Sequence, residues 1–406
     1  MSPRSLLLLA FAASALSAAE PLPPGLVFLQ ERVRKDPDDF IAQAQLAERC
    51  LSQLRDTGQM KWLPLAETAS VQALRGINPE NNPNGILAQG RVALAAHRFV
   101  AAREAAQLYR KLRPDKSAGV YLLFDAQLEL GDYSTAEAAL SELEKLEPDS
   151  ITVHSRRARL ASVRGQDTAA PTAAMLEAAR QLSPAQPAVL AWALVQSGER
   201  KFRSGDFDGA EKAYTEALAH RPGDWSATEH LAELRAAQGR TDEALALLDA
   251  AIAATESRPE LLQAAGDVAL AANREELART FHDRALAAYQ ASMDRGEVLY
   301  LHHLAGFYSD SRANYGEALK LARKDYADRQ SLGACEALAW ALSLAGQHDE
   351  AAKYADLAVA TGTRDAHILY RAGMIAMSHG QAAKGRELIR RAGTENPRHQ
   401  TVHFHR

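Results

Sequence analysis

Two stretches of the sequence repeat one another and decide the fold. GDYSTAEAALSELEKLEP occupies residues 131–148, and GDFDGAEKAYTEALAHRP occupies residues 205–222. Each begins with Gly, Asp and an aromatic residue, has Ala at its sixth position, continues with helix-forming residues and ends in Pro. Gly followed by Asp is typical of the end of one helix and the start of the next, and Pro stops the second helix.

The small residue at the sixth position recurs along the chain. Its successive occurrences are 36, 34, 34, 40, 34, 34, 40, 33 and 34 residues apart. The series consists of Ala66, Ala102, Ala136, Ala170, Ala210, Ala244, Ala278, Ala318, Ala351 and Gly385. A period of this length indicates repeated units that must stack on their neighbours to bury their apolar faces.

The pattern within each unit predicts two antiparallel helices. With the recurrent small residue numbered 20 in its unit, small or apolar residues gather near positions 4, 7, 8 and 11, as on one face of a helix. Gly or Asn near position 15 ends this first helix in most units. The sequence is also rich in alanine, the best helix former. We therefore expect an all-α solenoid of about ten helix-turn-helix units.

These units resemble the tetratricopeptide repeat (TPR) family, which has a helix-turn-helix period of 34 residues. The resemblance extends over residues 38–399, and residues 191–224 carry it best, with Gly198, Gly205, Phe207, Ala210 and Tyr214 at the family's spacing. It implies a right-handed superhelical solenoid whose concave groove binds a protein or peptide. The first unit departs from the pattern through extra residues at 54–64, and the unit near 298–331 through a long turn around 311–314.

The two spacings of 40 residues divide the array into blocks. The first contains the helix-breaking sequence SPAQP at 183–187, and the second surrounds residues 293–296, where the lack of proline allows one long helix. The expected organisation is a signal peptide at 1–19, a lead-in at 20–37, repeat blocks at 38–184, 185–294 and 295–399, and a His-containing tail at 400–406.

The N-terminus and the charge balance narrow the setting. Arg4, an apolar run at 6–16 and small residues at 17–19 form the layout of a secretory signal peptide, and no stretch is long enough for a membrane helix. We expect an exported protein, periplasmic or secreted, without a transmembrane segment. With 47 Lys and Arg against 51 Asp and Glu, a nucleic-acid partner is not expected. The polar last helix favours a monomer.

Candidate partner-binding residues lie at positions 2, 5, 9 and 12 of the first helices, opposite the packing face. The sequence predicts a groove with an acidic middle and an aromatic, Met-lined C-terminal end, suited to a basic and apolar peptide. The alternative is that its aromatic residues pack on neighbouring helices, in which case replacing Trp340 and Tyr370 by Ala would strongly destabilise the protein. The candidates are Tyr121, Trp192, Phe202, Glu229, Glu233, Asp267, Trp340, Tyr370, Met374 and Met377.

No catalytic or cofactor motif accompanies the repeats. We therefore expect no enzyme, no cofactor and no metal, and interpret the chain as an exported interaction scaffold. One alternative is an accessory subunit of a cell-envelope assembly or polysaccharide-export machine, a role in which exported proteins of this family are found. Another is small-ligand or metal binding, through the groove or through His399, His403 and His405. The free groove positions do not match the Lys, Asn and Arg clamp by which some family members hold a terminal carboxylate.

Overall fold

The protein is a solenoid of helix pairs. The computed structural model describes residues 22–400, and every regular element within that range is helical. A first helix, α1 (Pro24–Lys35), precedes ten antiparallel pairs, which we number as units one to ten. The expected all-α architecture of about ten helix-turn-helix units is therefore confirmed.

The bounds of the pairs follow the expected period. Units one to five are α2 (Phe40–Thr57) with α3 (Trp62–Gln72), α4 (Pro83–Ala95) with α5 (Phe99–Leu112), α6 (Ser117–Leu130) with α7 (Tyr133–Leu146), α8 (Ile151–Val163) with α9 (Ala169–Leu182), and α10 (Pro187–Arg203) with α11 (Phe207–His220). Units six to ten are α12 (Trp225–Ala237) with α13 (Thr241–Ala254), α14 (Pro259–Ala271) with α15 (Glu275–Asp294), α16 (Leu301–Gly306) with α17 (Tyr315–Asp328), α18 (Leu332–Leu344) with α19 (His348–Ala360), and α20 (Ala366–Ser378) with α21 (Ala382–Glu395).

The Gly-Asp pairs lie at helix ends, as the sequence predicts. Gly131 and Gly205 end their helices with φ of 81° and 80°, in the left-handed region that costs glycine least. The following Asp132 and Asp206 accept hydrogen bonds from backbone N–H groups at the start of α7 and α11. One dipeptide therefore ends the first helix of a unit and begins the second.

The irregular spacings correspond to longer or broken helices. α10 has 17 residues and begins at Pro187, the last residue of the SPAQP breaker, and α15 is a single helix of 20 residues. In unit eight, the six-residue α16 continues into a π-helical turn at Phe307–Ser311 before α17 begins. A short helix Pro79–Asn81 precedes α4. The departures noted in the first and eighth units are thus local changes in helix length that leave the pairing intact.

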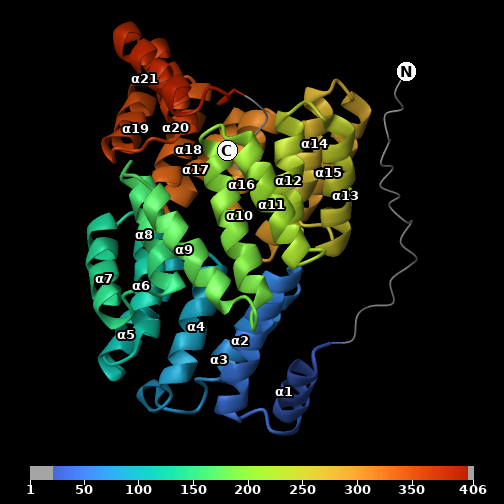
Figure 1. Ribbon diagram of the computed structural model, residues 1–406, viewed down its shortest axis with the longest axis vertical. Coiled ribbons are helices and arrows are strands. Elements are labelled where there is room, and N and C mark those ends of the chain that lie inside the picture. The colour runs from blue at the N-terminus through green and yellow to red at the C-terminus, as the bar shows by residue number, and fades with distance from the viewer. Residues whose placement is uncertain (1–21, 401–406) are drawn as a thin grey trace, which may run out of the picture.

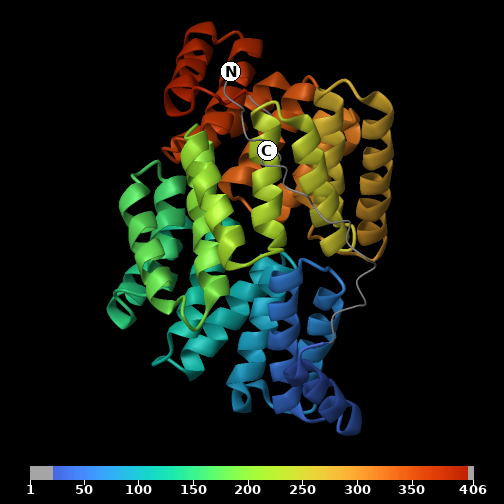
Figure 2. The same ribbon diagram turned by 45° about the vertical axis from the view of Figure 1, so that its right-hand side comes forward.

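One turn of the superhelix comprises six units, so that each later unit contacts the unit six places before it. Gln330 N, just before unit nine, donates to Leu130 O in unit three at 3.2 Å. A Cβ built on Gly165 in unit four would lie 1.9 Å from Gly362 O, just before unit ten. Figure 1 and Figure 2 accordingly show α18 to α21 above α6 to α9, and α12 to α15 above α2 and α3. The second superhelical turn therefore stacks directly on the first.

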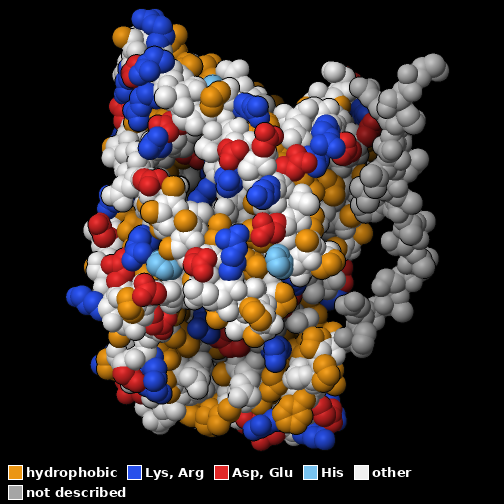
Figure 3. Space-filling model, viewed as in Figure 1, with side chains coloured by type: hydrophobic (Ala, Val, Ile, Leu, Met, Phe, Trp, Pro, Cys, Tyr) orange, Lys and Arg blue, Asp and Glu red, His pale blue; other side chains and the backbone are white. Residues whose placement is uncertain are grey.

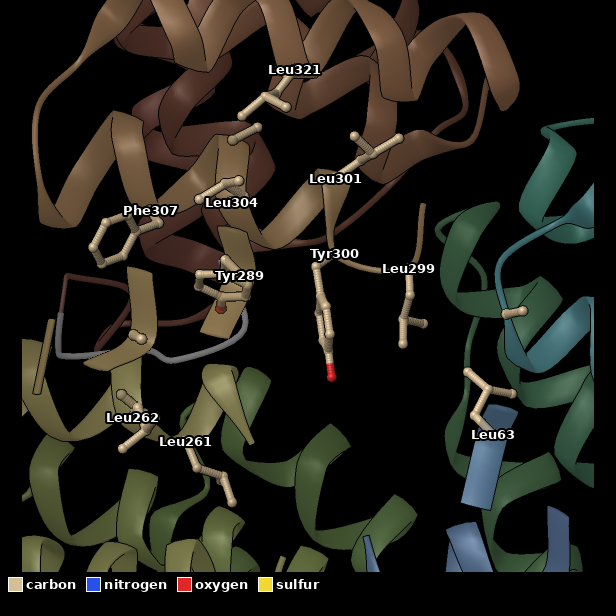
Figure 4. Packing of buried hydrophobic residues seen from close by; sticks show 14 of the residues in the cluster. Leu63, Leu261, Leu262, Tyr289, Leu299, Tyr300, Leu301, Leu304, Phe307 and Leu321 are labelled. Atoms are coloured by element: carbon tan, nitrogen blue, oxygen red, sulfur yellow. The ribbon is translucent and has the colours of Figure 1, made fainter. Parts of the chain in front are cut away.

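The core is continuous between the two turns. One cluster of buried residues joins units one and two to units six to ten. Figure 4 labels three members of this cluster that come from different units: Leu63 of unit one, Leu261 of unit seven and Tyr300 of unit eight. Units that are hundreds of residues apart in sequence are thus stabilised by shared apolar burial as well as by nearest-neighbour stacking.

Three further points concern the cysteines, membrane helices and the expected signal peptide. Cys50 and Cys335 are buried and free, and burial raises the pKa of the Cys50 thiol to about 11. Within residues 22–400, no helix combines the length and apolarity needed to cross a membrane. The expected signal peptide at 1–19 lies outside the described residues, as do residues 401–406 of the expected tail.

Candidate functional site: a pocket on the inner helices

The first helices of the units line a pocket inside the superhelix, and we call these the inner helices. The pocket has a volume of about 630 Å³, within the range of small-ligand sites. We call it the Trp192 pocket, after its most exposed large apolar side chain. Its lining comes from α2, α6, α8, α10, the turn before α12 and the first turn of α12. It consists of Ser52, Arg55, Asp56, Asp125, Ile151, Thr152, Ser155, Arg156, Arg159, Ala188, Val189, Trp192, Val195, Gln196, Arg221, Asp224 and Ser226.

Trp192 presents an apolar surface to the pocket. It is 44% exposed, whereas its neighbours Ala191 and Leu194 on α10 are buried in the core. Val189, one turn before it, and Ile151 at the start of α8 also line the pocket. An accessible indole in a concave site is typical of a binding anchor, since Trp supplies a large contact area at low entropic cost.

Ion pairs form the opposite wall. Asp125 on α6 accepts hydrogen bonds from Arg156 and from Arg159 Nη1, the latter at 2.9 Å. Arg159 also bonds Glu129 at 3.0 Å. These pairs join units three and four across the inner face, so the arginines are held in defined positions.

A second set of ion pairs joins unit one to the turn between units five and six. Arg221, in the turn between α11 and α12, lies 3.3 Å from an oxygen of Asp56 on α2 and 3.4 Å from one of Asp224. Asp224 also caps α12 by accepting from Ala227 N at 2.9 Å. The pocket is therefore built from elements far apart in sequence.

A second pocket adjoins the first. It has a volume of about 490 Å³ and shares Ser52 with the Trp192 pocket. Its lining comes from α1, α2 and α4 and includes the ion pair between Arg91 and Glu48, at 2.9 Å. The two pockets follow α2 on the inside of the superhelix, which gives the groove a length suited to an extended segment.

Two of the predicted groove residues lie at this site. Trp192 lines the pocket. Tyr121 lies behind it, with the Arg156 guanidinium 4.8 Å from its ring centroid and its hydroxyl donating to Glu147. Burial and the Glu147 carboxylate raise the pKa of Tyr121. Tyr121 therefore positions a pocket arginine, while Trp192 is open to a ligand.

The predicted acidic middle is not an open surface. Glu229 and Glu233 are buried, with 6% and 1% exposure, and Phe202 is also buried and stacks on Phe207 at 5.3 Å. His230 Nδ1 lies 3.6 Å from Glu233. Burial alone would lower the pKa of His230, but the hydrogen bond to Glu233 and the nearby carboxylates outweigh it and raise that pKa to about 9. The expectation of exposed carboxylates here is corrected: both side chains are buried in the folded protein.

Asp267 is bonded to residues of its own unit and of the next. Its carboxylate lies 2.9 Å from His282 Nε2 and accepts from Ser311 Oγ at 3.1 Å. These bonds connect α14, α15 and the π-helical turn. Asp267 thus organises the junction between units seven and eight, apart from the Trp192 pocket.

The predicted C-terminal aromatics are mostly packed. Trp340 Nε1 donates to Asp310 at 3.0 Å, and the Arg371 guanidinium lies 4.7 Å from its ring centroid. Tyr370 packs against the core and its ring lies 5.2 Å from that of His399. Met374 and Met377 are 37% and 40% exposed on α20. The alternative of packing on neighbouring helices therefore describes Trp340 and Tyr370, and only the two methionines remain open.

Sequence reasoning missed the polar wall of the pocket. Asp125 stands at position 9 of unit three and Arg159 at position 9 of unit four, on the free face that the repeat register marks. The register therefore marks both residues, although the predicted groove residues include neither of them. Within residues 22–400, no group of three or more His, Cys, Asp or Glu side chains is arranged to hold a metal ion.

The surface charge is mixed. On the face of the molecule shown in Figure 3, charged side chains of both signs are interspersed.

Comparison with known proteins follows the repeats. The family model described as tetratricopeptide repeat matches residues 121–187 and 195–259, which span most of units three to six. A search of curated proteins gave no significant match. The human IFIT1 dimer with PPP-AAAA aligns over 92% of this chain and 95% of its own, with 13% identity and a TM-score of 0.45.

Two further solved structures are similar at the same level of identity. The human IFIT1 dimer with m7Gppp-AAAA aligns over 90% of this chain and 84% of its own, with 13% identity and a TM-score of 0.48. Yeast Tom70 aligns over 87% of this chain and 91% of its own, with 13% identity and a TM-score of 0.37.

Proposed function

We propose that this chain is an exported, non-catalytic scaffold that binds a segment of a partner protein on its inner helices. One observation carries the proposal: the Trp192 pocket combines an exposed indole with ordered ion pairs inside a superhelix of matched repeats. Concave surfaces of helical repeats serve widely for protein interaction. An apolar anchor beside a few fixed polar groups is the usual composition of such a site.

Capture of the partner tests the binding proposal. The tagged mature chain is crosslinked in cells and purified, and captured proteins are identified by mass spectrometry. The same capture with Trp192→Ala, a change at an exposed residue, should lose the partner. Leu357→Ala on the outer helix α19 is the matched control, because Leu357 has a similar exposure of 46%. Partners captured equally with both variants would contradict binding at the pocket.

Export is a separate part of the proposal and rests on the sequence at 1–19. Its test is the N-terminal sequence of the protein recovered from each cell fraction. Removal of about nineteen residues, with the product outside the cytoplasm, is the expected result. An intact Met1 in the cytoplasmic fraction would contradict export and leave the binding proposal unchanged.

A further inference from the structure

All carboxylates that line the Trp192 pocket are paired with guanidinium groups, whereas not every arginine there is paired with a carboxylate. Each of its three carboxylates has a guanidinium partner within the pocket: Asp125 with Arg156 and Arg159, and Asp56 and Asp224 with Arg221. No carboxylate in the pocket is therefore left to attract a cationic ligand. This differs from the acidic groove that the sequence suggests.

Two arginines have no such partner: Arg55 on the pocket lining, and Arg200 on α10, beyond the lining. Among the described residues, no Asp or Glu oxygen lies within 4.0 Å of the side-chain nitrogens of Arg55 or Arg200. Arg55 is exposed on the pocket lining, and its backbone carbonyl is held by Trp225 Nε1 at 3.1 Å. Arg200 lies one helical turn beyond Gln196 on α10 and donates to its carbonyl at 2.7 Å. Arg55 therefore offers the pocket a guanidinium that has no carboxylate partner.

Arg200 lies near two further arginines, Arg159 and Arg203, and near Glu199. Burial lowers the pKa of Arg200, Glu199 opposes this change, and Arg159 and Arg203 lower the pKa further. The first turns of α8, α10 and α12 also line the pocket, and helix N-termini carry partial positive charge. A ligand carboxylate would be stabilised here, whereas a ligand ammonium would meet like charge.

The apolar wall specifies the second half of the ligand. Trp192, Val189 and Ile151 form a surface that a bulky aliphatic or aromatic side chain can cover. From the charge balance and this wall together, we infer that the pocket takes a partner-protein segment in which a bulky apolar side chain is flanked by Asp or Glu. This inference rests on the proposed function and names the chemistry of the ligand.

Three short fluorescent peptides provide the test. They share the same apolar residues and carry Glu, Gln or Lys at the flanking positions, and binding to the full mature chain is measured by anisotropy. The Glu peptide should bind about tenfold or more tightly than the Gln peptide, and the Lys peptide weakest, because one charge-assisted hydrogen bond contributes roughly that factor. The preference should shrink as salt is added, since exposed charges are screened.

Variants place the binding at the pocket. Trp192→Ala and Arg55→Gln should each weaken the Glu peptide about tenfold. The control Arg386→Gln makes the same charge change at an exposed arginine on α21 that also has no carboxylate within 4.0 Å in the described chain, and it should leave binding unchanged. An equal loss in the control would show that net charge alone is sensed, which overturns the inference.

The remaining outcomes separate the inference from the proposed function. Preference for the Lys peptide, or for a single-stranded oligonucleotide over the Glu peptide, overturns the acidic and apolar chemistry. Failure of all three peptides to bind also overturns it. In each case the proposed function is judged separately, by whether Trp192→Ala loses its captured partner in cells.

Discussion

At the scale of the residue, two tryptophans on inner helices predict opposite stability effects. Trp340 packs against the core, bonds Asp310 and lies under Arg371, whereas Trp192 is 44% exposed. We expect Trp340→Ala to lower the free energy of unfolding by about 2–4 kcal/mol, and Trp192→Ala by less than about 1 kcal/mol. Urea denaturation of the three proteins measures both values. Equal losses would contradict the assigned environments.

His230 predicts a pH dependence of stability. Its pKa is raised to about 9 in the folded protein, against about 6.5 when unfolded. The protonated ring therefore stabilises the fold fully below pH ~6.5, and this contribution, about 3 kcal/mol, is lost as the pH rises through ~9. The free energy of unfolding of the native protein should fall toward that of His230→Gln over this window. A constant difference between them would contradict the raised pKa.

Three residues at one repeat position show the limits of sequence reasoning about the site. Asp125, Arg159 and Glu233 correspond to position 9 of their units, and the register places all three on the free face. Asp125 and Arg159 line the pocket, but Glu233 is 1% exposed. The difference arises because other parts of the chain cover Glu233, and a register within one unit carries no information about that cover.

At the scale of the element, two glycines that end inner helices predict the closeness of the superhelical turns. Gly165 and Gly239 both have positive φ, 64° and 75°, so Ala at either position costs about 1–2 kcal/mol for the left-handed backbone. A Cβ on Gly165 would also lie 1.9 Å from Gly362 O, whereas a Cβ on Gly239 meets nothing within 4 Å.

Gly165→Ala should therefore lower the melting temperature clearly more than its matched control Gly239→Ala. The two variants share the backbone cost and differ only in the contact with the second superhelical turn. Calorimetry of both variants measures the difference. Equal melting temperatures would mean that the two turns are not in contact at Gly165 in solution.

Elements were the most predictable part of the fold. The Gly-Asp pairs at 131–132 and 205–206 determine helix ends through groups only a few residues apart, so sequence alone places them. The π-helical turn after α16 was less accessible, because it depends on contacts with α14 and α17. Sequence indicated only an extended turn there.

At the scale of the whole molecule, contact between the superhelical turns predicts a compact particle. A compact chain of 406 residues has a radius of gyration of roughly 22 Å. The double variant Gly165→Glu, Arg329→Glu disrupts two contacts between the turns, since Arg329 lies 3.3 Å from Glu129. Solution scattering should show a larger radius for it, with unchanged helix content by circular dichroism.

The control for this prediction is Gly239→Glu, Arg386→Glu, which makes the same changes away from the turn contacts. Its radius should equal that of the native protein. A native radius already well above the compact value would contradict contact between the turns, as would an identical radius in both double variants.

The contact between the two superhelical turns could not be predicted from the sequence. The period determines neighbouring contacts, but a small rotation per unit accumulates along the array and decides whether the turns meet. Contacts such as Gln330 N to Leu130 O join residues that no local pattern connects. The Trp192 pocket depends on such a contact too, because Arg221 lies close to Asp56.

One measurement tests the central claim most directly: photo-crosslinking in cells from a photoreactive amino acid with a large aromatic side chain, which replaces Trp192 and keeps its apolar bulk. The same amino acid at Leu357, equally exposed on the outer helix α19, is the control. We predict that a distinct partner is crosslinked from position 192 and not from position 357, and that Arg55→Gln weakens the signal. Identical crosslinks from both positions, or none from position 192, would contradict partner binding on the inner helices.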